Sequence, residues 1–265
     1  MKKTEFRQIN LSKGFVRIYD FGATKLHYYT ANDPIGDQVI LVEGEKGVVS
    51  IEAPLFKDSV AELNAYVASL KKPVSILLAN HVAPKDYLPD APLITTKKAY
   101  VALTSGSQIA LYNSFRKAFG DAIQAEDRES FAFVKEGKNV IQGVELNLLE
   151  NHDGFDVEIP SANSLYLHML GHDVHSIVPG VDGAKAMIAE FEGVEKKGYD
   201  LLLTSHYEAE DESDVAAKVA YLKKTIEIAS ASTDRASFTA KMKEAFPKYQ
   251  GDNYLGISAS IFFQK

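Results

Sequence analysis

The sequence predicts an α/β fold built from two runs of short strands, each followed by amphipathic helices. Short β-branched or aromatic runs alternate with glycines in the first third of the chain and again from Phe131. Segments with apolar residues at helical spacing follow each run of strands. The composition, 46% hydrophobic and 25% charged over 265 residues, is typical of a globular protein with a substantial core.

The first third of the chain predicts strands at residues 15–19, 25–30, 39–42 and 48–51, joined as hairpins. A helix should follow, because Val60, Leu63 and Val67 recur on one helical face. Ser59, with Glu62 three residues later, predicts a capping box at the start of this helix. We expect the helix to lie on the sheet.

Residues 74–79 form a nearly continuous apolar run, which indicates a strand buried on both faces. The sequence of residues 102–128 predicts helix, although its apolar residues follow helical spacing only weakly. Further strands are expected at 131–134, 144–149, 164–170 and 201–204, helices at 183–197, 214–231 and 241–246, and a closing strand at 256–263. Within 164–170, His168 alternates with apolar residues, which favours a role in the core or in a hairpin.

Composition excludes several classes of function. The chain has no cysteine, so a metal would have to be held by histidines and carboxylates. Its net charge is −7 and it has no dense basic cluster, so we expect no nucleic-acid partner. No apolar run approaches the length of a membrane span, and the N-terminal residues lack the apolar core of a signal peptide. We therefore expect a cytoplasmic protein with no membrane partner, organised as a single domain over residues 1–265.

Four predicted strands end in histidine or aspartate. Because ligands of α/β proteins gather beyond the carboxyl ends of strands, these residues are the candidates for a metal site. They are His81 after residues 74–79, His152 after 144–149, Asp173 after 164–170 and His206 after 201–204. The alternative is that these side chains only form hydrogen bonds to the loops in which they lie.

The order of these elements resembles the metallo-β-lactamase fold, a four-layer αββα sandwich of two similar halves, over about residues 25–229. Residues 39–52 are similar to the opening hairpin of that family, which ends in an acidic residue; Glu52 stands where aspartate is usual. Residues 74–86 resemble the strand that ends in the HxHxDH metal motif, with His81 as its first histidine. The resemblance implies ligand roles for His152, for Asp173 and, as the last histidine, for His206.

The chain departs from the family pattern at two motif positions. Ala83 stands where the second histidine is usual, and Asp86-Tyr87 replaces an Asp-His pair and is shifted by one residue. The resemblance therefore implies one metal rather than two, held by His81, His152, Asp173 and His206. Zinc is the first expectation, iron or manganese the alternatives, and a chain without metal remains open. His172, His175 and Glu208 are the next candidate ligands if two metals bind.

The activity that the resemblance implies is metal-dependent hydrolysis of a small ester, thioester, amide or phosphoester. Asp173 or Asp86 would orient the water, and Tyr87 would donate to an oxyanion unless it only packs in the core. The alternative is a non-catalytic protein of this fold that binds a small molecule or a partner. An oxygen-reducing iron centre ranks third, because it needs more ligands than this chain offers. A homo-oligomer remains open.

Overall fold

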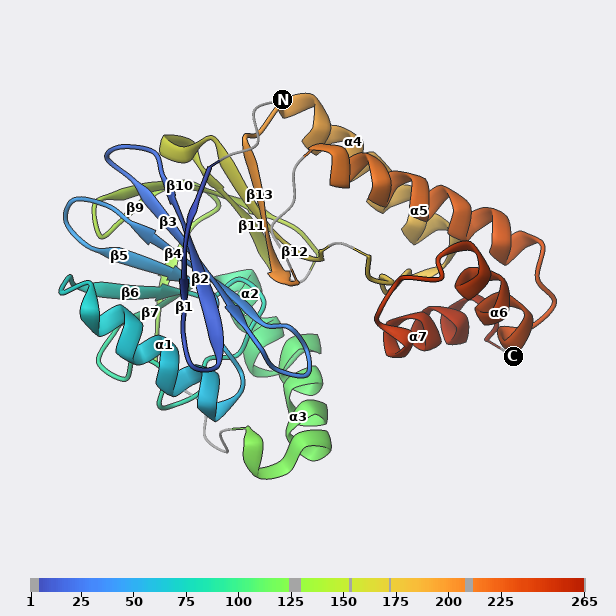
Figure 1. The fold of residues 1–265 in the computed structure, drawn as a ribbon, viewed down its shortest axis with the longest axis horizontal. Coiled ribbons are helices and arrows are strands. Elements are labelled where there is room, and N and C mark those ends of the chain that lie inside the picture. Colours follow the sequence, from blue (N-terminus) through green and yellow to red (C-terminus); the bar gives the residue numbers. More distant parts are fainter. Residues whose placement is uncertain (1–4, 124–129, 153, 172, 208–211, 265) are drawn as a thin grey trace. The chain divides into compact units, whose positions relative to one another are not determined.

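The computed structural model describes residues 5–123, 130–152, 154–171, 173–207 and 212–264 (Figure 1). The chain divides into two compact units. The first unit comprises Met1–His168 and Leu203–Tyr207, and the second comprises Met169–Leu202 and Glu208–Lys265. Organisation as a single domain stays a prediction.

An eight-stranded sheet forms the centre of the first unit, and its strands lie side by side in the order in which they occur in the chain. The first five strands pair antiparallel, which confirms the predicted hairpins, and the remaining pairs are parallel. The strands are β1 (Arg7–Asn10), β2 (Gly14–Asp20), β3 (Lys25–Ala31), β4 (Gln38–Glu43), β5 (Val48–Ile51), β6 (Val74–Leu77), β7 (Leu93–Thr96) and β8 (Phe131–Val134).

The sheet forms where predicted because its central strands are apolar on both faces. Every residue of β5 is buried, and five of the six residues of β4 are. The sequence analysis did not predict β1 or β7. Both are four-residue strands with mixed polar and apolar residues, so they lack a distinctive pattern.

Helix α1 (Lys57–Ser69) packs on the sheet, as predicted. The Tyr29 hydroxyl of β3 donates to Glu62 Oε1 at 3.1 Å, which ties the helix to the strand. The predicted capping box is wrong, because Phe56 is the N-cap and Ser59 lies inside the first turn, where it is buried. Glu62 instead accepts hydrogen bonds from Ser12 Oγ and the Lys13 backbone N–H.

A second sheet has five strands in the order β13-β12-β11-β10-β9. They are β9 (Gly137–Ile141), β10 (Val144–Glu150), β11 (Phe155–Ile159), β12 (Ser164–Leu170) and β13 (Leu201–His206). Within the first unit, side chains join the two sheets: the Tyr28 hydroxyl lies 3.2 Å from the Thr204 carbonyl oxygen, and the Gln142 side-chain amide donates to Ser75 Oγ at 2.8 Å. Strands β12 and β13 each contribute residues to both compact units.

The middle of the chain, predicted as weakly patterned helix, contains two helices of the first unit. They are α2 (Lys97–Thr104) and α3 (Ser107–Phe119), followed by the short helix η1 (Gly120–Ala122). Thr96 caps α2 by accepting from the Ala99 N–H. Residues 124–128 of the predicted stretch lie outside the described part.

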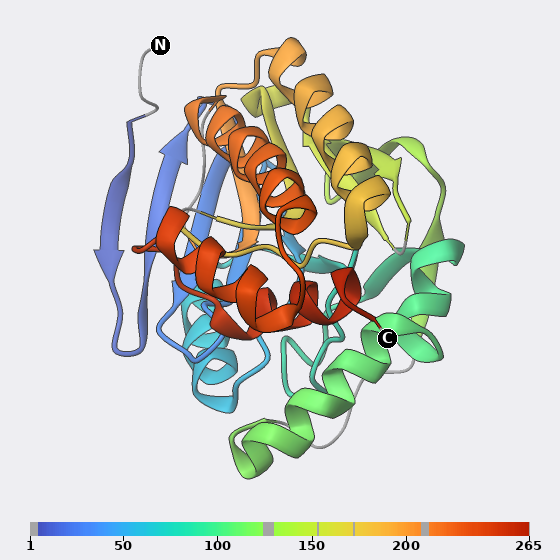
Figure 2. The same cartoon turned by 90° about the vertical axis from the view of Figure 1, so that its right-hand side faces the viewer.

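Four helices make up most of the second unit: α4 (Gly180–Lys197), α5 (Glu212–Ser230), α6 (Arg235–Ala245) and α7 (Asp252–Phe262). The two orange helices in Figure 2, α4 and α5, run alongside one another, and α6 and α7 also pack together. The prediction of a closing strand at 256–263 is wrong, because α7 covers all but the last of these residues. Its buried residues Leu255, Ser258 and Ala259 follow helical spacing, which a short apolar run does not distinguish from a strand.

Among the described residues, no helix combines the length and the apolar character needed to cross a membrane.

Candidate metal centre

Three histidines of the first unit each bring one ring nitrogen into a common cluster, and these donor atoms all lie within 4.8 Å of one another. His81 follows β6, His168 lies in β12 and His206 is the last residue of β13. The ring centroids are 5.2 Å (His81–His206), 5.3 Å (His81–His168) and 5.6 Å (His168–His206) apart. This histidine triad thus combines donors from a loop of the first sheet and two neighbouring strands of the second.

The buried surroundings of the triad favour neutral imidazoles. Burial, with a smaller contribution from the charge of His81, lowers the pKa of His168 to about 3. Burial and the charges of His81 and His168 hold the pKa of His206 well below its ordinary value. Because neutral imidazole is the form that binds a metal ion, the donor set fits a divalent metal.

Two backbone carbonyls orient the rings. His81 Nδ1 lies 3.3 Å from the Ala53 carbonyl oxygen, and His206 Nδ1 lies 3.2 Å from that of Ile35. A carbonyl oxygen only accepts, so each Nδ1 carries the proton and donates it. Each Nε2 is then left with a lone pair for a metal.

The Asp37 carboxylate lies beside the His206 ring, on the side of Nδ1. Its Oδ1 atom lies 3.5 Å from His206 Nδ1, and its Oδ2 atom accepts from the Leu55 N–H at 2.9 Å. The Asp37 side chain is 1% exposed. Burial, with the neighbouring charges of Asp33 and Glu52, raises the pKa of Asp37 well above its ordinary value.

Glu52 fixes the loop that carries His81. Its buried carboxylate accepts from the backbone N–H groups of Asn80 and His81, both at 2.8 Å. The Tyr166 hydroxyl, two residues before His168 on β12, donates to Glu52 Oε1 at 2.6 Å. Glu52 therefore connects the His81 loop to the strand that carries His168, and it lies at the end of the opening hairpin, where the sequence placed it.

Of the four predicted ligands, His81 and His206 lie in the triad. Among the described residues, that group includes neither His152, which is exposed in the turn after β10, nor Asp173. Asp173 belongs to the second unit, where it is exposed and its carbonyl oxygen accepts from the Gln250 N–H at 2.7 Å. Ligand roles for His152 and Asp173 stay predictions.

The sequence analysis named three further candidate ligands, and the structure describes one of them. His172 and Glu208 lie outside the described residues. His175 is fully buried in the second unit, with Nδ1 3.2 Å from the Tyr221 hydroxyl.

Asp86 and Tyr87 occupy different surroundings. Asp86 is exposed, and its carbonyl oxygen accepts from the Asn64 side-chain amide at 2.7 Å. Tyr87 is fully buried, its hydroxyl lies 2.7 Å from Ser50 Oγ, and burial raises its pKa above the ordinary value. This is the packing arrangement that was the alternative for Tyr87, and catalytic roles for both residues stay predictions.

His168 is the member of the triad that the sequence analysis missed. A search for ligands at the ends of strands does not find His168, because this residue lies within β12. The available signal was the strand alternation, which puts His168 on the same face as Tyr166. A tyrosine and a histidine on one face of an otherwise apolar strand indicate a polar neighbour there.

Comparisons with known proteins identify the fold. No family model matches the sequence, and neither does any curated protein. Among solved structures, the chain is similar to the inverting sec-alkylsulfatase Pisa1 from Pseudomonas sp., with a TM-score of 0.59 and 13% identity over 89% of this chain and 48% of the sulfatase. The chain therefore spans about half the length of that enzyme.

Two metallo-β-lactamases give similar alignments. IND-7 has a TM-score of 0.51 and 16% identity, covering 83% of this chain and 98% of the enzyme. The enzyme from Erythrobacter litoralis has a TM-score of 0.50 and 12% identity, covering 82% of this chain and 100% of the enzyme. The chain has the metallo-β-lactamase fold, which confirms the predicted fold class.

Proposed function

We propose that this protein is a metal-dependent hydrolase in which the histidine triad holds a single divalent ion. The observation that carries the proposal is the convergence of three largely buried imidazoles, two of which donate Nδ1–H to a backbone carbonyl. Three histidines that leave a fourth position for water are a common catalytic zinc set. Zinc is therefore the first candidate, with iron and manganese as alternatives.

A divalent ion in the triad would lower the pKa of a bound water toward neutrality and polarise an ester, amide or phosphoryl oxygen. The residues of the chain would hold the donor atoms in place. The carbonyl groups of Ala53 and Ile35 fix two imidazole tautomers, and Glu52 fixes the backbone of His81. We propose a small-molecule substrate and no nucleic-acid partner, in a cytoplasmic setting. Sulfate esters join the candidate substrates because the similar sulfatase is named for secondary alkyl sulfates.

The test is a hydrolysis assay on protein loaded with zinc, iron or manganese, using p-nitrophenyl acetate, an aryl thioester, bis-p-nitrophenyl phosphate and a secondary alkyl sulfate. We expect turnover of one ester class that a chelator abolishes and that His206→Ala loses. His152→Ala is the matched control, because this exposed histidine is not in the triad. No turnover with any metal would reject the hydrolase, and full turnover in His206→Ala would reject the triad as its metal site.

The motif positions support a second candidate, a non-catalytic protein that binds a small molecule in this fold. Ala83 is 2% exposed and Tyr87 is fully buried, so two positions that supply ligands in the family contribute to the core here. This candidate predicts a protein that folds without metal and takes up none of the three ions on loading.

A further inference from the structure

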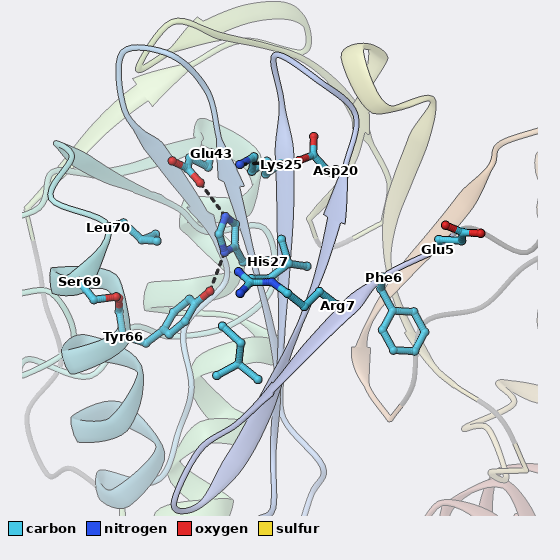
Figure 3. A pocket seen from close by; sticks show the side chains of 12 residues that line it. Glu5, Phe6, Arg7, Asp20, Lys25, His27, Glu43, Tyr66, Ser69 and Leu70 are labelled. Carbon is cyan, nitrogen blue, oxygen red and sulfur yellow. Dashed lines mark hydrogen bonds and ion pairs between the residues drawn. The ribbon is translucent and has the colours of Figure 1, made fainter.

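A pocket of about 680 Å³ lies in the first unit, away from the histidine triad (Figure 3). Strand β4 separates the two. Asp37, beside His206, directly precedes β4, whereas Glu43, the last residue of β4, lines the pocket. At about 3.3 Å per residue, the two ends are about 20 Å apart.

Strand register gathers the pocket residues on one face of the sheet. Arg7 pairs with Ile18, and Ile18 pairs with His27, so their side chains share a face. Two residues further along these strands, Lys25 pairs with Glu43 on the same face. The C-terminal part of α1 supplies Tyr66, Ser69 and Leu70.

The hydrogen bonds of His27 fix the polar groups of the pocket. His27 Nε2 lies 2.8 Å from Glu43 Oε2, and Nδ1 lies 2.7 Å from the Tyr66 hydroxyl. A carboxylate only accepts, so Nε2 carries the proton. Burial lowers the pKa of His27, so the ring is neutral and Nδ1 accepts from Tyr66. The Tyr66 oxygen therefore keeps lone pairs for a further donor.

The pocket lining carries three carboxylates, those of Glu5, Asp20 and Glu43, and two cations, those of Arg7 and Lys25. Lys72 Nζ lies 2.7 Å from Glu43 Oε1, so that carboxylate already has a partner, and Lys25 pairs with Asp20 at 3.7 Å. Arg7 forms no ion pair with any of the described residues. In Figure 3 its guanidinium points toward His27 and Tyr66.

We propose that this pocket binds a small organic anion, with its carboxylate or phosphate on Arg7 and its apolar body against Ile9, Ile18 and Leu70. A guanidinium forms paired, charge-assisted hydrogen bonds with such a group. The volume lies within the usual range of small-molecule pockets. A hydroxyl or amine of the ligand would donate to the Tyr66 oxygen. This site is independent of the triad and of the proposed hydrolysis.

The test is a titration of the full, ¹⁵N-labelled chain followed by amide chemical shifts, with a chelator present so that no metal in the triad can bind the probe. The probes are benzoate, phenyl phosphate and, as the uncharged counterpart, benzyl alcohol. We expect saturable shifts in β1 to β3 with benzoate or phenyl phosphate, and affinity for benzyl alcohol weaker by about tenfold or more.

Two variants complete the test. Arg7→Ala should weaken binding of the anion by about tenfold or more, whereas Arg116→Ala, which removes the same charge from α3, should leave it unchanged. Tyr66→Phe keeps the helix packing and should retain the preference for an anion over benzyl alcohol. Lack of saturable shifts in β1 to β3 with both anions, or equal affinity in wild type and Arg7→Ala, would overturn the proposal.

Discussion

Glu52 carries a buried carboxylate that backbone amides, not a cation, stabilise. It is fully buried and accepts from two backbone N–H groups and the Tyr166 hydroxyl, and no described cation forms an ion pair with it. Hydrogen bonds of this kind compensate the lost hydration of a carboxylate only while every donor has its acceptor.

Glu52→Gln should therefore destabilise the protein by about 2 to 4 kcal/mol, because the new amide group would direct N–H donors at other N–H donors. Urea unfolding followed by circular dichroism measures this change. Glu45→Gln is the matched control, since Glu45 is exposed in the turn between β4 and β5, and it should stay within about 0.5 kcal/mol of wild type. Equal stability of the two variants would contradict the role given to Glu52.

His27 predicts how stability depends on pH. Burial lowers its pKa in the folded protein, whereas an unfolded chain has a histidine pKa of about 6.5. As pH falls below that value, the unfolded state binds more protons than the folded state, so the free energy of unfolding decreases. The contribution of His27 is complete above the unfolded pKa and is lost on acidification.

His27→Gln should show a shallower loss of stability than wild type between about pH 7.5 and about pH 5.5, because glutamine does not titrate. Urea unfolding at several pH values measures the two slopes. The other histidines contribute equally to both proteins, so the difference isolates His27. Parallel slopes would show that His27 is protonated to the same extent in both states.

His168 and His152 show why the members of the histidine triad could be predicted only in part from the sequence. The rule that candidate ligands follow strands selected two members of the triad, because His81 lies in the loop after β6 and His206 is the last residue of β13. The same rule favoured His152 over His168, since it ignores residues within strands. Which face of β12 meets the His81 loop depends on how the two sheets pack, and the sequence of one strand does not contain that information.

Helices and strands were predicted correctly where the apolar periodicity of the local sequence matches the faces that the fold buries. The buried strands β4 and β5 and the helix α1 appear where apolar periodicity placed them. Local pattern failed at α7, whose short apolar run fits either period, and at Ser59, whose capping signal lies within the helix. Tertiary contacts decide such cases, as the burial of Ser59 illustrates.

Helix α6 offers a test at the scale of one element. Asp234 is its N-cap, and its Oδ1 atom accepts from the Ser237 N–H at 2.8 Å. Asp234→Ala should cost about 1 kcal/mol, because it removes the acceptor for this N–H group. Hydrogen exchange of the first-turn amides of α6 measures the effect. Asp182→Ala, in the exposed first turn of α4, is the control that should leave those amides unchanged.

At the scale of the whole molecule, the fold class predicted from the family resemblance is confirmed. The predicted metallo-β-lactamase arrangement rested on a resemblance to that family in element order and partial motifs, although the three solved structures compared above are only 12–16% identical to the chain. Substrate choice did not follow, because it depends on side chains that no shared motif fixes.

Whole-chain unfolding tests the single-domain prediction. Strands β12 and β13 each contribute residues to both compact units, so the loss of either unit should disrupt strands of the other. We expect one calorimetric transition with equal calorimetric and van't Hoff enthalpies. Two resolved transitions would mean that the units unfold independently.

The most direct test of the histidine triad is the metal content of three proteins purified without a metal-binding tag and loaded with zinc: wild type, His168→Ala and His152→Ala. Elemental analysis should find about one equivalent in wild type and in His152→Ala, and a large loss in His168→Ala, because three donors define the site. Full zinc content in His168→Ala, together with its loss in His152→Ala, would contradict the triad and favour the ligand set predicted from the sequence.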